Sequence, residues 1–81
     1  MVVTVRVFAY LRDLMGQERC QLTLPAGASV RDALERLGER SHRMQTWLAY
    51  CRPAVNRCYE SWDTILCDGD ELSVIPPVSG G

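Results

Sequence analysis

The residues of this 81-residue chain best suited to chemistry are the last two, Gly80 and Gly81. A glycine end has no side chain, so its backbone can enter a narrow channel and approach a reactant closely. A carboxylate is a poor electrophile until it is activated, most simply as an acyl-adenylate made from ATP. Attack by sulfur on this mixed anhydride gives a thiocarboxylate, whereas attack by an amine gives an isopeptide-linked modifier. We therefore expect Gly81 to be the reactive residue.

The residues before this end predict an extended connection to a folded domain. Pro76 and Pro77 lack backbone N–H donors, so a sheet cannot continue past Ile75, and their fixed φ angles favour an extended exit. Six extended residues span roughly 20 Å, at about 3.3 to 3.6 Å each. We expect a domain over residues 1–75 and a flexible tail over residues 76–81. The tail residues expected to thread into a partner's active site are Pro76, Pro77, Val78, Ser79 and Gly80.

The composition excludes several classes of function. The formal net charge is −1, and the nine basic residues, all arginine, are spread from Arg6 to Arg57, which argues against a nucleic-acid footprint. No apolar run approaches the roughly 20 residues of a membrane helix, and no signal-peptide pattern precedes the first strand. A Walker-type phosphate loop needs a lysine, which the chain lacks. We expect a cytoplasmic protein whose activating enzyme binds and consumes ATP in trans.

The cysteines do not predict a metal centre. No two of the four cysteines form a C-x-x-C pair, and His42 is the only histidine. The sequence therefore lacks the ligand spacing that is typical of a structural zinc site. The cysteines are separated by 30, 6 and 8 residues, which does not fit a plant-type iron–sulfur cluster. Without an export signal, reduced thiols that fill the core are the expectation. We expect no metal and no bound cofactor.

Hydrophobic periodicity predicts the first half of the fold. Apolar residues alternate from Val3 to Ala9 and again from Cys20 to Leu24, which indicates two strands. Between them, residues 10–15 form a short helical turn that Gly16 ends. Ser29 is the expected N-cap of a helix, with Asp32 placing negative charge in its first turn. The apolar side of this helix is formed by Val30, Ala33, Leu34 and Leu37.

The second half predicts a shorter helix and two further strands. Met44, Trp47, Leu48 and Cys51 repeat the helical spacing as a core stripe that Pro53 ends. Residues 54–59 form a third strand with a bend at Asn56, because asparagine tolerates left-handed backbone. A loop over residues 62–67 then carries Ile65 and Leu66 inward, and the turn 68–70 leads into a last strand over residues 71–75.

This order predicts an α+β fold in which a mixed sheet packs on one main helix and one short helix. A right-handed crossover through the main helix places the last strand parallel to the first and beside it. That is the β-grasp, or ubiquitin-like, arrangement. Its C-terminal tail leaves from a central strand, so we expect the tail to project from a rigid element.

The sequence resembles the small, sulfur-carrying subunit of molybdopterin synthase, of the MoaD-like group in the ubiquitin-like superfamily. The resemblance extends essentially from end to end. Its closing Pro-Pro-Val-Ser-Gly-Gly is more specific than Gly-Gly alone, because related carriers end differently. The segments that carry it are residues 8–16, 54–57, 68–72 and 75–81.

The resemblance implies a role for Gly81 and for several partners. An E1-like enzyme would adenylate Gly81, and sulfur from a sulfurtransferase would convert it to a thiocarboxylate. The large synthase subunit would accept the tail, and sulfur would pass to cyclic pyranopterin monophosphate to form the molybdopterin dithiolene. The family forms a heterotetramer of two small and two large subunits, so the small subunit is not an enzyme on its own.

Docking on the large subunit should involve the end of the first strand and the base of the tail. An alternative is that Phe8 and Leu11 simply complete the core. Other functions also remain open: a carrier for thiazole, cysteine or tRNA thiolation, or a ubiquitin-like modifier of other proteins. The expected docking residues are Phe8, Leu11, Arg12, Ile75, Pro77 and Val78.

Overall fold

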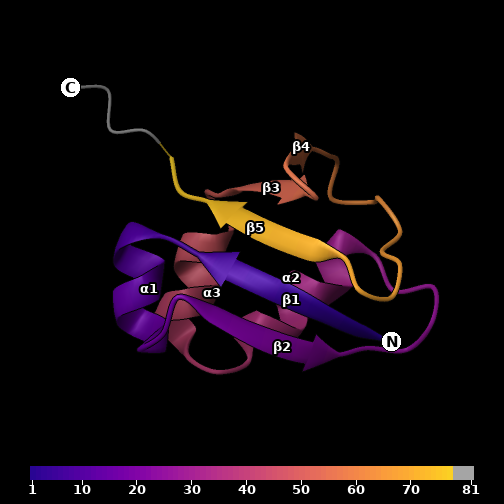
Figure 1. Cartoon of the computed structure of the whole chain (residues 1–81). Helices are drawn as coiled ribbons and strands as arrows, with labels where there is room; N and C mark the ends of the chain where they lie inside the picture. The colour runs from indigo at the N-terminus through magenta and orange to yellow at the C-terminus, as the bar shows by residue number, and fades with distance from the viewer. Residues whose placement is uncertain (78–81) are drawn as a thin grey trace.

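The computed structural model describes residues 1–77, and these form one mixed sheet with helices on one face, the predicted α+β arrangement (Figure 1). No helix within these residues has the length and apolar character needed to cross a bilayer. The elements in chain order are β1 (Val2–Val7), α1 (Ala9–Met15), β2 (Arg19–Thr23), α2 (Val30–Gly38), α3 (His42–Leu48), β3 (Arg52–Val55), β4 (Cys58–Tyr59) and β5 (Glu71–Ile75).

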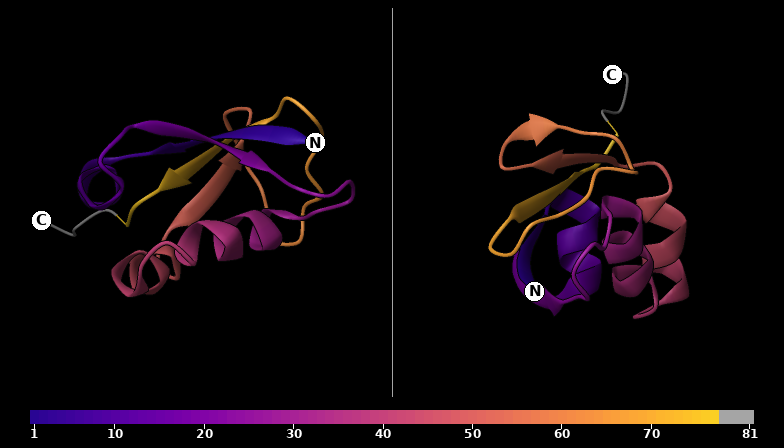
Figure 2. Two further views of the ribbon diagram at one scale, coloured as in Figure 1. Left: turned by 90° about the horizontal axis from the view of Figure 1, so that it is seen from below. Right: turned by 90° about the vertical axis from the view of Figure 1, so that its right-hand side faces the viewer.

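The sheet has the strand order β2-β1-β5-β3-β4, with β5 at its centre. β1 pairs parallel with β5 and antiparallel with β2, while β3 runs antiparallel to both β5 and β4. The predicted parallel pairing of the first and last strands is therefore confirmed. The helices cover one face of the sheet and leave the other face open (Figure 2). This is the predicted β-grasp, or ubiquitin-like, fold.

The core lies between the helical layer and the inward side chains of β1 and β5. Val3, Val5 and Val7 are fully buried, as the alternation in the sequence predicts. From β5, Leu72 and Val74 enter the same cluster. The helix α2 contributes the four residues expected from its spacing, Val30, Ala33, Leu34 and Leu37.

The start of α2 is fixed by a reciprocal cap. The Ser29 hydroxyl accepts a hydrogen bond from the Asp32 N–H at 3.2 Å, and the Asp32 carboxylate accepts one from the Ser29 N–H at 2.9 Å. Both groups satisfy backbone donors that have no partner inside the helix. The predicted N-cap at Ser29 is thus confirmed.

The first strand is shorter than predicted. β1 ends at Val7, and Ala9, expected to be a buried strand residue, is exposed with φ 50° at the start of α1. The chain turns here because the Phe8 carbonyl accepts the N–H groups of Leu11 and Arg12, at 3.1 and 3.4 Å, and so begins a helix. Gly16 ends that helix with φ 78°, as expected from its position.

The predicted third strand is two strands. β3 and β4 form a hairpin whose turn residues, Asn56 and Arg57, have φ 49° and 73°. The bend at Asn56 is therefore confirmed, but the strand does not continue through it. Pro53 lies inside β3 instead of ending the second helix, which stops at Leu48. A proline is tolerated there because its missing donor would face the short strand β4, and its carbonyl accepts the Glu60 N–H at 3.2 Å.

Two apolar residues expected in the core lie at the surface. Trp47 is 39% exposed and packs against the ring of Tyr10, with 5.0 Å between the ring centroids. The stripe on α3 thus buries Met44 and Leu48 but leaves Trp47 at its rim. Ile65 is 57% exposed, because its backbone forms a bridge to Ser29 while the next residue, Leu66, points inward.

Candidate functional site

The predicted tail begins at the carboxyl end of β5, in the middle of the sheet. Ile75 ends the strand and is half-buried, Pro76 is half-buried, and Pro77 is exposed. β5 stops at Ile75, as its two following prolines predict. The other tail residues, Val78, Ser79, Gly80 and the expected reactive residue Gly81, lie outside the described residues.

The opposite end of β5 is fixed by the turn that precedes it. The Asp68 carboxylate accepts the Val2 N–H at 2.7 Å, and the Val2 carbonyl accepts the Gly69 N–H at 2.8 Å. Asn56 donates its side-chain amide to the Asp70 carboxylate at 3.0 Å. These contacts join the turn to β1 on one side and to the β3–β4 hairpin on the other. β5 is therefore held at its start as well as along both edges.

The open face of the sheet surrounds the end of β5. Strand register places Ser73 between Arg6 on β1 and Ala54 on β3. Ser73 is only 7% exposed although it lies on the face away from the helices. Two pairs further along, and so on the same face, Ile75 lies opposite Arg52. The central strand thus presents Ser73 and Ile75 on this face, opposite Arg6 and Arg52.

Two arginines on this face lie over aromatic rings. The Arg6 guanidinium carbon is 5.1 Å from the centroid of Phe8, and that of Arg52 is 4.2 Å from the centroid of Tyr59. Such cation–π contacts orient the guanidinium groups. Arg6 also forms ion pairs with Glu18 at 3.3 Å and Glu71 at 4.0 Å. We call Arg6, Phe8, Arg52, Tyr59 and Ile75 the open-face surface.

The structure separates the residues predicted for docking. Phe8 and Ile75 are half-buried members of the open-face surface. Leu11 is 1% exposed and belongs to the core, so it is removed from the docking set, in agreement with the alternative interpretation of this residue. Arg12 is exposed on α1 rather than on a strand. Arg52 and Tyr59 were not among the predicted docking residues, because the hairpin that brings them together was not predicted.

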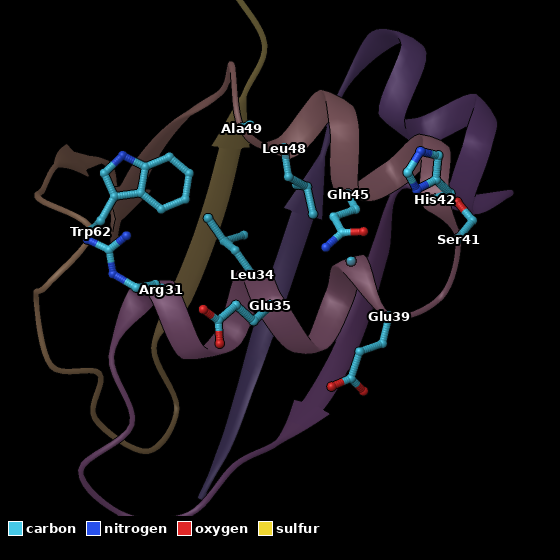
Figure 3. A pocket seen from close by; sticks show the side chains of 11 residues that line it. Arg31, Leu34, Glu35, Glu39, Ser41, His42, Gln45, Leu48, Ala49 and Trp62 are labelled. Carbon is cyan, nitrogen blue, oxygen red and sulfur yellow. The ribbon is translucent and has the colours of Figure 1, made fainter.

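A groove between α2 and α3 lies on the helical side, away from the open-face surface (Figure 3). Leu34 and Leu48 line its middle, and Trp62 lies at one end, beside Arg31. Arg31 is paired with Asp63 at 3.1 Å, and no hydrogen bond joins two of the described side chains that line the groove. Residues 1–77 contain no group of three or more His, Cys, Asp or Glu side chains that could hold a metal ion.

The thiols differ in burial, and only one is a core residue. Cys51 is buried and donates its S–H to the Trp47 carbonyl at 3.3 Å. Burial raises the pKa of the Cys51 thiol to about 11, which keeps it protonated and unreactive at neutral pH. Cys20 is half-buried, and Cys58 and Cys67 are exposed, contrary to the expectation that all four fill the core. All four are free thiols, as expected.

Known proteins match this chain along almost its whole length. The model of the ThiS family matches residues 5–81. The molybdopterin synthase sulfur carrier subunit of Arabidopsis thaliana is 30% identical over 79 residues, which cover 98% of this chain and 82% of that protein. The protein of the same name from Chlamydomonas reinhardtii is 31% identical over 83 residues, covering 100% of both.

Solved structures with the same fold include subunits of molybdopterin-converting factors. A Pyrococcus furiosus protein described as molybdopterin converting factor subunit 1 has 36% identity and a TM-score of 0.86, covering 96% of this chain and 99% of that one. A chain from the complex of subunits 1 and 2 of the molybdopterin-converting factor of Helicobacter pylori 26695 has 28% identity and a TM-score of 0.71, with 100% of both chains covered. From its sequence, its β-grasp architecture and these relatives, the chain belongs to the ThiS family.

Proposed function

We propose that this protein is the sulfur carrier subunit of molybdopterin synthase, in which Gly81 carries the transferred sulfur. The observation that supports this most directly is the placement of β5. It is the central strand, is paired on both edges, and ends at two prolines that lead to Gly80-Gly81. Relatives that match along essentially the whole chain are named as such carriers.

The proposed chemistry proceeds in two stages at the Gly81 carboxylate. A carboxylate oxygen attacks the α-phosphorus of ATP on an E1-like enzyme, and pyrophosphate leaves. A persulfide carried by the sulfurtransferase then attacks the carbonyl carbon of the acyl-adenylate, and AMP leaves. A second thiol cleaves the resulting acyl disulfide, which gives the thiocarboxylate and a disulfide on the sulfur donor. Glycine suits both stages because it has no side chain to obstruct the approach of either reactant. ATP is bound and consumed by the activating enzyme.

The thiocarboxylate then acts as a nucleophile in the large synthase subunit. Its sulfur bonds to cyclic pyranopterin monophosphate, and water then hydrolyses the resulting thioester, which leaves the sulfur on the substrate and restores the Gly81 carboxylate. Two carriers supply the two sulfurs of the dithiolene. In this scheme the large subunit binds the substrate and provides acid–base groups, in a heterotetramer of two small and two large subunits. The small subunit thus loses its sulfur in each transfer and must receive a new one before it can act again in the sulfurtransferase complex.

The open-face surface is the proposed docking site for the large subunit. It combines two half-buried apolar side chains, Phe8 and Ile75, with two guanidinium groups oriented by aromatic rings. Aromatic and arginine side chains are the types that most often dominate interface energetics. This surface also lies at the origin of the tail, so one partner can cover it and receive residues 76–81 together. The Helicobacter pylori neighbour comes from a complex with subunit 2, which supports a partner of this kind.

Intact-mass spectrometry tests the proposal. The purified chain is incubated with ATP, an E1-like enzyme and a sulfur source, then supplied with the large subunit and cyclic pyranopterin monophosphate. We expect a mass gain matching replacement of one oxygen by sulfur at Gly81, and its loss as molybdopterin forms. A thiocarboxylate that forms but is not consumed would point to another sulfur pathway. Conjugates on a denaturing gel would point to a protein modifier, and no mass gain would contradict the carrier role.

A further inference from the structure

The outer strand β2 has backbone N–H and C=O groups on its free edge that form no hydrogen bonds to another strand of the sheet. It lies at one end of the strand order and pairs only with β1. Hydrogen bonds from the Val7 N–H to the Glu18 carbonyl at 2.9 Å and from the Leu24 N–H to the Met1 carbonyl at 2.8 Å fix which residues face β1. In an antiparallel pair, every second residue directs its backbone N–H and C=O groups towards the neighbouring strand, and the residues between direct theirs away from it. The N–H and C=O groups left facing outward belong to Arg19, Gln21 and Thr23.

Two adjacent shallow hollows follow this edge and share Gln21 and Arg40. The first includes Arg19 and lies along the beginning of β2, whereas the second includes Arg36 and lies between β2 and the end of α2. Arg36 lies on α2 and Arg40 just after its end, and both line the second hollow. The free edge of β2 therefore lies beside Arg19 of the sheet and beside Arg36 and Arg40 at the end of α2.

These three arginines are charged groups with no ion pair among residues 1–77. The ion pairs in that part of the chain involve Arg6 and Arg31 only. Glu39 is the one acidic residue that lines either hollow. The edge of β2 is accordingly positive in a chain whose formal net charge is −1. Its charge is complementary to acidic side chains.

A second copy of this chain is a poor occupant of the edge. Pairing two β2 strands would bring like-charged arginines together, and charged side chains on edge strands oppose such self-association. Nucleic acid would satisfy the guanidinium groups but not the row of alternating backbone donors and acceptors. An extended peptide with acidic side chains satisfies both sets of groups, as in strand addition to an exposed sheet edge.

We propose that the edge of β2, together with Arg19, Arg36 and Arg40, binds an extended acidic segment of a partner protein as a sixth strand. The added strand would exchange backbone hydrogen bonds with Arg19, Gln21 and Thr23 while its carboxylates pair with the arginines. This interaction does not depend on the chemistry of Gly81 or on the open-face surface. It would recruit a partner while the tail is engaged elsewhere or is unmodified.

The test uses the full ¹⁵N-labelled chain and a capped synthetic peptide of alternating valine and glutamate, seven residues long. Nuclear magnetic resonance should show slowed amide exchange at Arg19, Gln21 and Thr23 on binding. Cys20 and Leu22, whose amides already face β1, should change little and serve as internal controls. Affinity should fall as salt is raised, because exposed charges are screened.

Matched peptides and variants separate strand addition from general attraction. A peptide methylated on alternate backbone nitrogens keeps its charges but loses its donors, and it should not bind. The double variant Arg36→Gln/Arg40→Gln should weaken binding roughly 2- to 30-fold, at a typical 0.2–1 kcal/mol for each exposed pair. The control Arg43→Gln, an exposed arginine on α3, should leave the affinity unchanged.

Several outcomes would overturn the proposal. Equal binding of the methylated peptide would show that backbone pairing is not involved. Changes mapped to the open-face surface instead of β2 would move the site elsewhere. Tighter binding of a short single-stranded DNA than of the acidic peptide would replace the peptide partner with nucleic acid. The absence of any binding at millimolar peptide would reject the site altogether.

Discussion

Ile75 lies directly opposite Arg52 in the register of β5 and β3, at the last pair before the chain leaves the sheet. Arg52 is in turn held over the ring of Tyr59, at 4.2 Å from its centroid. The base of the tail is therefore bordered by a guanidinium group whose position is set by a second hairpin strand. We expect a partner that receives the tail to contact this pair.

The first prediction concerns Phe8 on the same surface. Phe8→Ala should weaken binding to the large synthase subunit by about 1–3 kcal/mol, the loss typical of an aromatic interface residue. Isothermal titration calorimetry measures the affinity, and urea unfolding checks that the carrier still folds. Ile65→Ala is the matched control, because Ile65 is an exposed apolar residue in the loop that leads to the opposite end of β5. Equal affinities for the two variants would reject Phe8 as a docking residue.

A second prediction concerns the reactive end. Removal of Gly81, or Gly81→Ala, should abolish sulfur transfer without changing the midpoint of urea unfolding, because the sheet ends at Ile75. The Ala variant adds one methyl group next to the reacting carbon, where the channel of a partner has to be narrow. Mass spectrometry distinguishes failure of activation from failure of transfer. Full activity of the truncated chain would contradict the proposed function.

The third prediction concerns the turn between β3 and β4. Arg57 has φ 73°, a left-handed conformation that costs a non-glycine residue about 1–2 kcal/mol. Asn-Gly is the preferred pair for such two-residue hairpin turns, so Arg57→Gly should stabilise the domain by roughly 0.5–1 kcal/mol after the entropy of glycine is counted.

The neighbouring turn residue provides the contrasting variant. Asn56→Ala should destabilise the domain, because the Asn56 side chain bonds both the Asp70 carboxylate and the Glu71 N–H at 3.0 Å. The loss expected is about 1–2 kcal/mol, typical of hydrogen bonds of which one is to a charged group. Urea denaturation of both variants measures the difference. A loss of stability in Arg57→Gly would mean that its backbone strain is not relieved by glycine.

The fourth prediction concerns pH. Burial raises the pKa of the Cys51 thiol from 9.0 to about 11, so the folded state retains this proton where the unfolded state loses it. Stability linked to Cys51 is therefore complete below about pH 9 and falls as the pH rises towards 11. Between about pH 8 and 10, the free energy of unfolding of the native chain should fall by about 1 kcal/mol more than that of the Cys51→Ala variant. Parallel pH slopes for the two proteins would contradict the raised pKa.

Much of the fold could be predicted because local patterns agree with the final packing. The alternation through Val3, Val5 and Val7 matches the inward face of β1, and the Ser29 cap marks the start of α2. Gly16 ends α1 as its position indicates. These elements are specified by residues close in sequence, and the crossover rule then places β5 beside β1.

The errors occur where distant contacts override local patterns. The hairpin after Pro53 was missed because its turn residues, Asn56 and Arg57, lack the glycine that usually marks such a turn. Trp47 has core spacing, yet its ring packs on Tyr10 from α1 at the surface. The partnership of Arg52 with Tyr59, and hence half of the open-face surface, depends on that hairpin. No spacing rule within one segment could have found it.

The central position of β5 also governs when the molecule can be completed during translation. β1 and β2 emerge first and β3 and β4 later, but in the strand order only β5 joins the two pairs. The two strand pairs can be joined in this order only after β5 has been synthesised, when most of the chain is already made. A product truncated earlier lacks both the central strand and the glycine end. We therefore expect an incomplete chain to be inactive in the proposed sulfur transfer.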